Sequence, residues 1–134
     1  MIRKARKEDL KSICMSVYNK KIDYITVKSV KEDYQNGNLY LIEENGKILG
    51  QCALVPKEQY YAMQRLVLYN CKNAGKGIVT QFINYFISNG YTNLGLTPWS
   101  DNCRMKKILK RNQYKKIYSI RTYTDNNGIC SIDF

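Results

Sequence analysis

A short segment with two glycines constrains this chain most, because it separates an apolar run that ends at Tyr69 from a run with helical periodicity that begins at Ile78. The segment reads Ala74, Gly75, Lys76, Gly77, Ile78 and Val79. A strand, a glycine turn and a helix in this order direct several backbone N–H groups to one point, next to the positive end of the helix dipole. Glycine permits positive φ and leaves no side chain between those amides and a ligand. The segment therefore predicts an anion-binding turn, although the same pattern also occurs as a plain tight connection.

The length and composition are typical of one globular domain. A chain of 134 residues buries about two thirds of its unfolded surface without support from metals or disulfides, so we expect a single domain over residues 1–134. Hydrophobic residues make up 44% of the chain, which argues against disorder. No apolar run approaches the roughly 18–20 residues of a membrane span. Residues 1–7 are basic but lack the apolar segment of a secretory signal, so we expect a cytoplasmic protein.

The residue types limit the chemistry that is available. The chain has no histidine, which removes the Ser-His and Cys-His nucleophile arrangements and the commonest transition-metal ligand. Its five cysteines are widely spread, without the paired spacing of a zinc or redox site, and we interpret them as reduced small hydrophobic residues. We therefore expect no metal, and chemistry that depends on carboxylates, tyrosines, backbone amides or water.

The net charge of +11 favours an anionic partner but does not select one. A nucleic acid, a membrane surface and a phosphorylated small molecule would all be attracted. The basic residues between positions 102 and 116, where no acid occurs, are Arg104, Lys106, Lys107, Lys110, Arg111, Lys115 and Lys116. A solvated helix face explains this segment as well as a binding surface does.

Hydrophobic periodicity predicts a mixed sheet with helices. The elements expected before the glycine turn are a strand at 2–6, helices from residue 8 and at 29–35, and strands at 39–44, 47–55 and 60–69. Asn45-Gly46 between two apolar runs favours a type I′ turn, so the strands on either side of it should be antiparallel. The elements expected afterwards are a helix at 78–88, a strand at 94–97, a basic helix at 100–112, and strands at 114–123 and 128–134. The helix at 78–88 between two strands implies a parallel pair. We expect an α+β domain whose sheet is antiparallel early and parallel at the glycine turn.

These elements and their junctions resemble the GNAT superfamily of N-acetyltransferases, and the likeness covers nearly the whole chain. Residues 75–78, followed by Phe82 and Ile83, are similar to the family's acetyl-coenzyme A loop and its helix. A second similar segment comprises Thr97, Asn102, Met105, Ile108 and Tyr114. The resemblance implies a GNAT-like acyl-CoA N-acyltransferase fold, with acetyl-CoA as the co-substrate.

The resemblance also implies where the acetyl-CoA binds. The pyrophosphate would lie on the amides of residues 74–79, and cations would meet the ribose phosphate. The pantetheine arm would lie between splayed fourth and fifth strands and bond to the edge of the fourth. The cofactor-binding residues implied are Leu66, Val67, Leu68, Tyr69, Lys72, Ala74, Gly75, Lys76, Gly77, Ile78, Val79, Asn102, Lys106 and Lys107.

The chain departs from the family pattern at four positions. Ala74 stands where Arg or Gln is usual, and Val79 stands where Gly or Ala is usual, which would remove one polar contact and add two methyl groups near the cofactor. Leu109 stands where many relatives carry a Tyr that is thought to protonate the leaving thiolate, and Gln113 replaces a Gly. Because a thiol of pKa about 8.5 can leave as a thiolate, the missing donor does not exclude turnover.

The reaction implied is direct transfer of an acetyl group to a primary amine in a ternary complex. An ammonium group has no lone pair, so a base must accept its proton. The catalytic candidates are Glu58, as a base acting through water, and Asn102, which would bond the pantetheine arm or a water, or only cap a helix. Glu43 and Glu44 fit solvated turn positions better. A backbone N–H near Leu68 or Tyr69 would meet the oxyanion.

Two other functions remain open from the sequence. Val79 and Leu109 favour a GNAT-like module that binds CoA without catalysis. The basic segment and the twelve tyrosines allow nucleic-acid binding, although no recognition motif accompanies them. The sequence does not distinguish a small-molecule amine from a peptide amine as acceptor, or a monomer from a homodimer.

Overall fold

The fold was taken from a computed structural model that describes residues 1–20, 25–58, 60–70, 77–91, 94–96, 123–124 and 130–131. The chain divides into two compact units. The first unit comprises residues 1–54 and 65–78, and the second comprises residues 55–64 and 79–134. Both the third and the fourth strand cross from one unit to the other.

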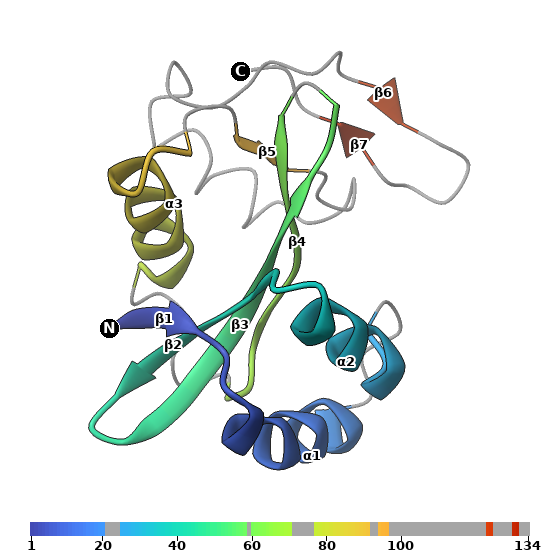
Figure 1. The fold of residues 1–134 in the computed structure, drawn as a ribbon, viewed down its shortest axis with the longest axis vertical. Coiled ribbons are helices and arrows are strands. Elements are labelled where there is room, and N and C mark those ends of the chain that lie inside the picture. The colour runs from blue at the N-terminus through green and yellow to red at the C-terminus, as the bar shows by residue number, and fades with distance from the viewer. Residues whose placement is uncertain are drawn as a thin grey trace. The chain divides into compact units, whose positions relative to one another are not determined.

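The described elements form a mixed α+β arrangement (Figure 1). They are β1 (Ile2–Lys4), the 3₁₀ helix η1 (Lys7–Asp9), α1 (Leu10–Lys20), α2 (Val27–Gln35), β2 (Leu39–Glu44), β3 (Lys47–Pro56), β4 (Tyr61–Leu68), α3 (Ile78–Ser88), β5 (Leu94–Leu96), β6 (Tyr123–Thr124) and β7 (Cys130–Ser131). One sheet has the order β1-β2-β3-β4-β5, and β6 and β7 form a separate antiparallel pair. Strand β2 is antiparallel to β1 and β3, whereas β4 and β5 are parallel. The predicted change from antiparallel to parallel pairing is confirmed.

The hairpin between β2 and β3 follows its local sequence. Asn45 and Gly46 both have positive φ, at 53° and 78°, as a type I′ turn requires. The turn joins Glu44 to Lys47, which are direct partners in the register. The predicted hairpin is therefore confirmed at the level of its turn residues.

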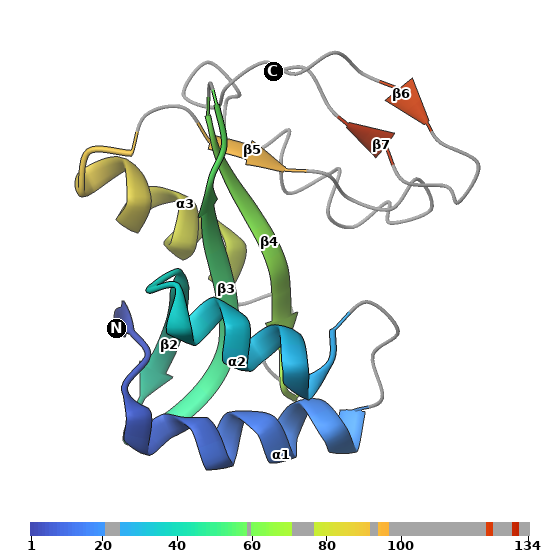
Figure 2. The same ribbon diagram turned by 45° about the vertical axis from the view of Figure 1, so that its right-hand side comes forward.

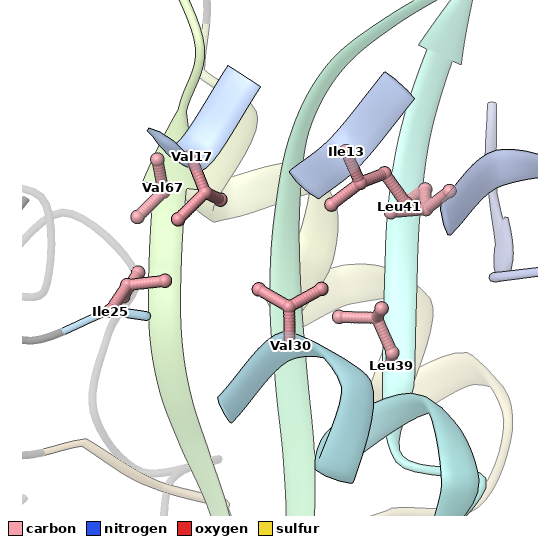
Figure 3. Packing of buried hydrophobic residues seen from close by; sticks show 7 residues of the cluster. All are labelled: Ile13, Val17, Ile25, Val30, Leu39, Leu41 and Val67. Atoms are coloured by element: carbon pink, nitrogen blue, oxygen red, sulfur yellow. The ribbon is translucent and has the colours of Figure 1, made fainter. Parts of the chain in front are cut away.

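The core of the first unit lies between the sheet and two helices on one face of it (Figure 2). Helix α1 contributes two side chains at helical spacing, and β2 contributes two at alternate positions (Figure 3). Helix α2, the segment before it and β4 contribute one side chain each. The cluster consists of Ile13, Val17, Ile25, Val30, Leu39, Leu41 and Val67, each at most 4% exposed. This core holds the second half of β4 against the α1–α2 layer.

Helix α3 ends in a Schellman motif in the second unit. The N–H of Gly90 bonds to the carbonyl of Ile87 at 3.1 Å, and the N–H of Tyr91 bonds to the carbonyl of Phe86 at 3.0 Å. Gly90 has φ +92°, which a residue with a Cβ rarely adopts. The ring of Tyr91 then meets the ring of Tyr61 edge-on at 4.8 Å between centroids. The predicted glycine stop of this helix is confirmed.

Three charged residues connect β1, η1 and β2 in what we call the N-terminal corner: Arg3, Asp9 and Glu43. Two guanidinium nitrogens of Arg3 donate to the two carboxylate oxygens of Asp9 at 2.7 and 3.0 Å, and Nε donates to Glu43 Oε2 at 2.8 Å. The Asp9 carboxylate also accepts from the N–H of Arg6 at 2.7 Å. Because that amide turns to Asp9, β1 ends at Lys4 instead of the predicted Arg6.

Other predicted boundaries also differ by one or two residues. Helix α2 starts at Val27, before the predicted Ser29, because Thr26 caps it. Thr26 Oγ1 accepts a hydrogen bond from the N–H of Ser29, and Ser29 Oγ accepts one from the N–H of Thr26, both at 3.0 Å. Glu8 and Asp9, predicted to open the first helix, lie in η1. The predicted basic helix at 100–112 lies outside the described residues, as do most of the two final strands.

Candidate functional site

The first part of the site expected from the sequence is the end of β4 together with the residue after it. We call these residues the donor segment: Leu66, Val67, Leu68 and Tyr69. The N–H of Tyr69 donates to the carbonyl of Leu49 in β3 at 2.9 Å. The carbonyl oxygen of Val67 also lies toward β3, since it is the nearest atom to a Cβ built on Gly50. Successive residues of an extended chain direct their backbone groups to opposite edges. Leu66 and Leu68 therefore direct theirs to the edge of β4 that faces away from β3.

The backbone amides of Leu68 and Tyr69 are the two candidates to bind the oxyanion, and this alternation directs them to opposite edges of the strand. The amide of Tyr69 is bonded to β3, so of the two positions Leu68 is the one directed to the opposite edge. The approach of β3 to the donor segment requires a glycine at position 50, because a Cβ there would lie 2.4 Å from the carbonyl oxygen of Val67. Gly50 thus allows β3 and the donor segment to lie unusually close together.

The side chain of Tyr69 is bound in the protein interior. Its hydroxyl donates to Oε1 of Gln51 at 2.6 Å, and burial raises the pKa of the phenol well above its ordinary value. Gln51 is fully buried, and its Nε2 has no hydrogen-bond partner among the described residues. A phenol held neutral with its proton already donated to an amide is poorly suited to protonate a leaving group. Tyr69 therefore does not replace the acid that the sequence lacks at Leu109.

Burial also makes Cys52 a poor thiol nucleophile. Cys52 is completely buried in β3, and this burial raises the pKa of its thiol well above the ordinary range. Only the thiolate is a strong nucleophile, so Cys52 is inert. Cys71 and Cys103 lie outside the described residues.

One residue before the donor segment, β4 contains a backbone feature that the sequence analysis missed. Arg65 has φ +48°, in the left-handed region that non-glycine residues rarely adopt. Its Nε and Nη2 donate to the two carboxylate oxygens of Asp33 at 2.5 and 2.6 Å. Asp33 is 4% exposed and lies on α2, one turn after the core residue Val30. An acid on the apolar face of a predicted helix was the signal that could have revealed this pair.

The pairing between β4 and β5 precedes this feature. The described register joins Tyr61 to Leu94, Ala62 to Gly95 and Met63 to Leu96. Arg65 follows two residues after Met63, and the donor segment follows Arg65. Strand β4 thus has a first part that pairs with β5 and a second part that begins after a left-handed residue.

The predicted glycine turn is described at its end, where α3 begins. Gly77 is exposed and has φ +71°, and a Cβ built on it meets no atom of the described residues within 4 Å. Helix α3 starts at the next residue, Ile78, so its first amides lack acceptors within the helix. Gly77 itself is exposed, and a glycine in this conformation is what an anion site at this turn requires.

Ile78 and Val79 are the first two residues of α3, and both side chains are buried, with 4% and 6% of the residue exposed. This burial agrees with the helical spacing of the apolar residues in 78–88. The prediction that the methyl groups of Val79 lie near the cofactor stays a prediction.

The remaining candidates lie at the ends of strands, in turns, or outside the described residues. Glu58 is exposed in the turn between β3 and β4, which is closed by a hydrogen bond from the N–H of Lys57 to the carbonyl of Tyr60 at 2.8 Å. Glu43 belongs to the N-terminal corner and is not a solvated turn residue as predicted, whereas Glu44 is exposed. The candidates outside the described residues are Lys72, Ala74, Gly75, Lys76, Asn102, Lys106 and Lys107.

The residues that the structure describes contain no cluster of three or more His, Cys, Asp or Glu side chains that could hold a metal ion. None of the helices in the described ranges has the length and apolar character of a bilayer span.

The fold is similar to that of solved GNAT acetyltransferases. An acetyltransferase of the GNAT family from Streptococcus agalactiae superposes with a TM-score of 0.77 at 13% identity, over 98% of this chain and 91% of that one. A GNAT acetyltransferase from Bacillus cereus gives 0.76 at 16% identity, over 98% and 92%. The aminoglycoside acetyltransferase AAC(6')-Ib, solved with coenzyme A and kanamycin, gives 0.68 at 17% identity, over 97% and 90%. No protein-family model matches the chain, and no curated protein matches it significantly. The chain has the GNAT fold that its sequence predicts.

Proposed function

We propose that this chain is an N-acetyltransferase that transfers the acetyl group of acetyl-CoA to a primary amine by direct attack in a ternary complex. Two observations carry the proposal within the GNAT fold: a donor segment with backbone groups on the edge that faces away from β3, and an exposed left-handed glycine directly before α3. The donor segment and Gly77 belong to the first unit, and α3 from Val79 onward belongs to the second. The two features suit the two chemically different parts of coenzyme A.

The donor segment suits the pantetheine arm. That arm carries two amides, which can bond to an extended backbone as an added strand does. Leu66 directs its N–H and carbonyl to the edge away from β3, and Val67 anchors the segment by its burial in the core. In this proposal Leu66 binds the arm, while Val67 and Tyr69 hold the segment in place from the other side.

The start of α3 suits the pyrophosphate. The first amides of a helix and its dipole stabilise negative charge, and an exposed glycine lets phosphate oxygens approach the backbone. Gly77 and Ile78 supply this end of the turn, and the sequence places Gly75 and Lys76 immediately before them. We assign the ribose phosphate to lysines, chosen from Lys72, Lys76, Lys106 and Lys107, because ammonium groups pair with phosphate oxygens.

Acetyl-CoA supplies a thioester, whose carbonyl carbon accepts the amine while the carbon–sulfur bond breaks and the thiolate leaves. The chain must take up a proton, since an amine of pKa about 10 is almost fully protonated at neutral pH. We propose that the carboxylate of Glu58 accepts it through water, and that Asn102 bonds the water or the pantetheine arm. Orientation of the two reactants supplies much of the acceleration.

Coenzyme A binding and turnover test the proposal separately. With coenzyme A at 100 times its dissociation constant, the free energy of unfolding should rise by about 2.7 kcal/mol, which thermal denaturation detects. Acetyl-CoA and a panel of small-molecule and peptide amines should then release free thiol, measured with a thiol reagent. Absence of any thermal shift at millimolar coenzyme A would overturn the proposal.

One departure from the family pattern, at Leu109, supports a second candidate function, a module that binds coenzyme A without turnover. Leu109 cannot donate a proton to a thiolate. A thermal shift with coenzyme A, combined with no thiol release across the amine panel, would favour this reading. Turnover that continues above the thiol pKa with undiminished kcat would favour the enzyme, because the thiolate then leaves without an acid.

A further inference from the structure

Arg65 is a costly residue at its position in β4. An L-residue with a side chain is strained at φ +48°, whereas glycine adopts that conformation freely. Strain of this kind persists only where surrounding contacts hold the residue. The position therefore needs an explanation that goes beyond the sequence of the strand itself.

A bidentate pair with Asp33 holds Arg65. Both carboxylate oxygens accept from the guanidinium, at 2.5 and 2.6 Å, and a planar fork of this kind fixes orientation as well as distance. Asp33 is itself fixed, because α2 is capped by Thr26 and packs into the core through Val30. The pair therefore connects a rigid helix to the strained residue of β4.

The backbone at Arg65 determines which edge each residue of the donor segment faces. A residue at positive φ interrupts the strict alternation of an extended strand. A shift of one position reverses the side and the edge of every later residue. With the present conformation, Val67 reaches the core and Tyr69 bonds to β3, so Leu66 faces the other edge.

We propose that the Asp33–Arg65 ion pair is a positioning device for the acyl donor, which holds the bend that presents Leu66 to the pantetheine arm. The inference rests on the proposed function. It assigns to α2 a role in binding the acyl donor, although α2 would not contact the donor itself. Asp33 and Arg65 act through the backbone of the donor segment and do not touch the reacting atoms.

The test separates the bend from the ion pair by two double variants. Both Asp33→Asn/Arg65→Gly and Asp33→Asn/Arg65→Val lack the pair, but glycine accepts positive φ and β-branched valine does not. Affinity for coenzyme A is measured by titration calorimetry, at a temperature where circular dichroism shows each protein folded. We expect the glycine variant to bind within threefold of the wild type, and the valine variant at least 30-fold more weakly.

The single variant Asp33→Asn adds a rescue. It keeps Arg65 but loses the carboxylate, so coenzyme A affinity should fall about tenfold. The further change Arg65→Gly should restore it, although the ion pair stays absent. A purely structural pair predicts the opposite: lower melting temperatures, with equal coenzyme A affinity in all folded variants, which would overturn the inference.

The wild type distinguishes this inference from the proposed function. Binding of coenzyme A by the wild type, with equal binding by the glycine and valine variants, overturns the positioning role and leaves the function standing. No binding by the wild type overturns both. Should the valine variant fail to fold, hydrogen exchange of the wild type decides. Coenzyme A should slow exchange of the Leu66 amide at least tenfold and leave exchange of the Leu41 amide in β2 unchanged. Equal exchange of the Leu66 amide with and without coenzyme A would overturn the positioning role.

Discussion

Two arginine–aspartate contacts in the first unit have similar geometry but different backbones. In the N-terminal corner, Arg3 lies in regular β1, opposite Leu41, and shares its guanidinium between Asp9 and Glu43. At the donor segment, Arg65 is left-handed and its partner Asp33 is more deeply buried, with 6% of its side chain exposed against 12% for Asp9. The same chemistry therefore stabilises a regular corner in one place and a strained strand in the other.

This difference separates stability from function. Loss of a contact in the corner leaves regular strands that can still pair. Loss of the Asp33–Arg65 contact removes support from a backbone conformation that β4 would not adopt alone. We expect variants in the corner to change stability alone, and variants around the donor segment to change ligand binding as well.

The largest expected effect is on stability, from Arg65→Met. This change leaves the buried carboxylate of Asp33 without its guanidinium, and breaking a buried pair in this way costs about 3–5 kcal/mol. Urea denaturation measures it, with Arg3→Met as the matched control. The control should lose less, because Glu43 and Asp9 are closer to solvent. An equal loss in the two variants would remove the distinction between the regions.

The next largest effect is on binding, from Gly77→Glu. A carboxylate at the start of α3 repels a diphosphate, and we expect coenzyme A affinity to fall about 100-fold, or about 2.7 kcal/mol. Gly77→Gln is the matched control, since it carries the same strain at φ +71° without the charge. Titration calorimetry should show a much smaller loss for Gly77→Gln. Similar losses would mean that the backbone conformation matters and the charge does not.

A smaller effect is expected in the corner, from Asp9→Asn. The change weakens two hydrogen bonds to Arg3 while Glu43 keeps its contact, so we expect a loss of about 1–2 kcal/mol in unfolding free energy. Coenzyme A affinity should stay within twofold of the wild type. A tenfold loss of affinity would show that the corner also supports the site.

The smallest effect is the acid dependence of the same residue. Hydrogen bonds from Arg3 lower the pKa of Asp9 in the folded protein. Its stabilisation is therefore complete above the unfolded pKa of about 3.9 and is lost as the pH falls through the lowered folded value. Between pH 6 and pH 3, the wild type should lose more unfolding free energy than Asp9→Asn, as measured by urea denaturation at each pH. Parallel losses would show that Arg3 does not control this carboxyl.

Much of the fold was readable from local sequence. Asn45-Gly46 specified the hairpin turn, Gly90 specified the end of α3, and Gly77 marked its start, since each depends on φ values that one or two residues decide. The order of strands and helices then implied the parallel pair, because a strand–helix–strand unit closes with one handedness. The GNAT fold followed from these features together.

The buried polar contacts could not be predicted in this way. Tyr69 was identified as part of the site, but its bond to Gln51, 18 residues away, turned its hydroxyl into the interior. Only the packing of neighbouring elements decided the orientation of that side chain.

The sequence by itself determined the elements, their order and the glycine positions, because these depend on interactions between residues close together in the chain. Only the tertiary structure decided that Asp33 on α2 meets Arg65 on β4, 32 residues later, and that β4 bends where they meet. A contact of that separation forms only after helix and strand have packed on a common core, so neither residue reveals it alone.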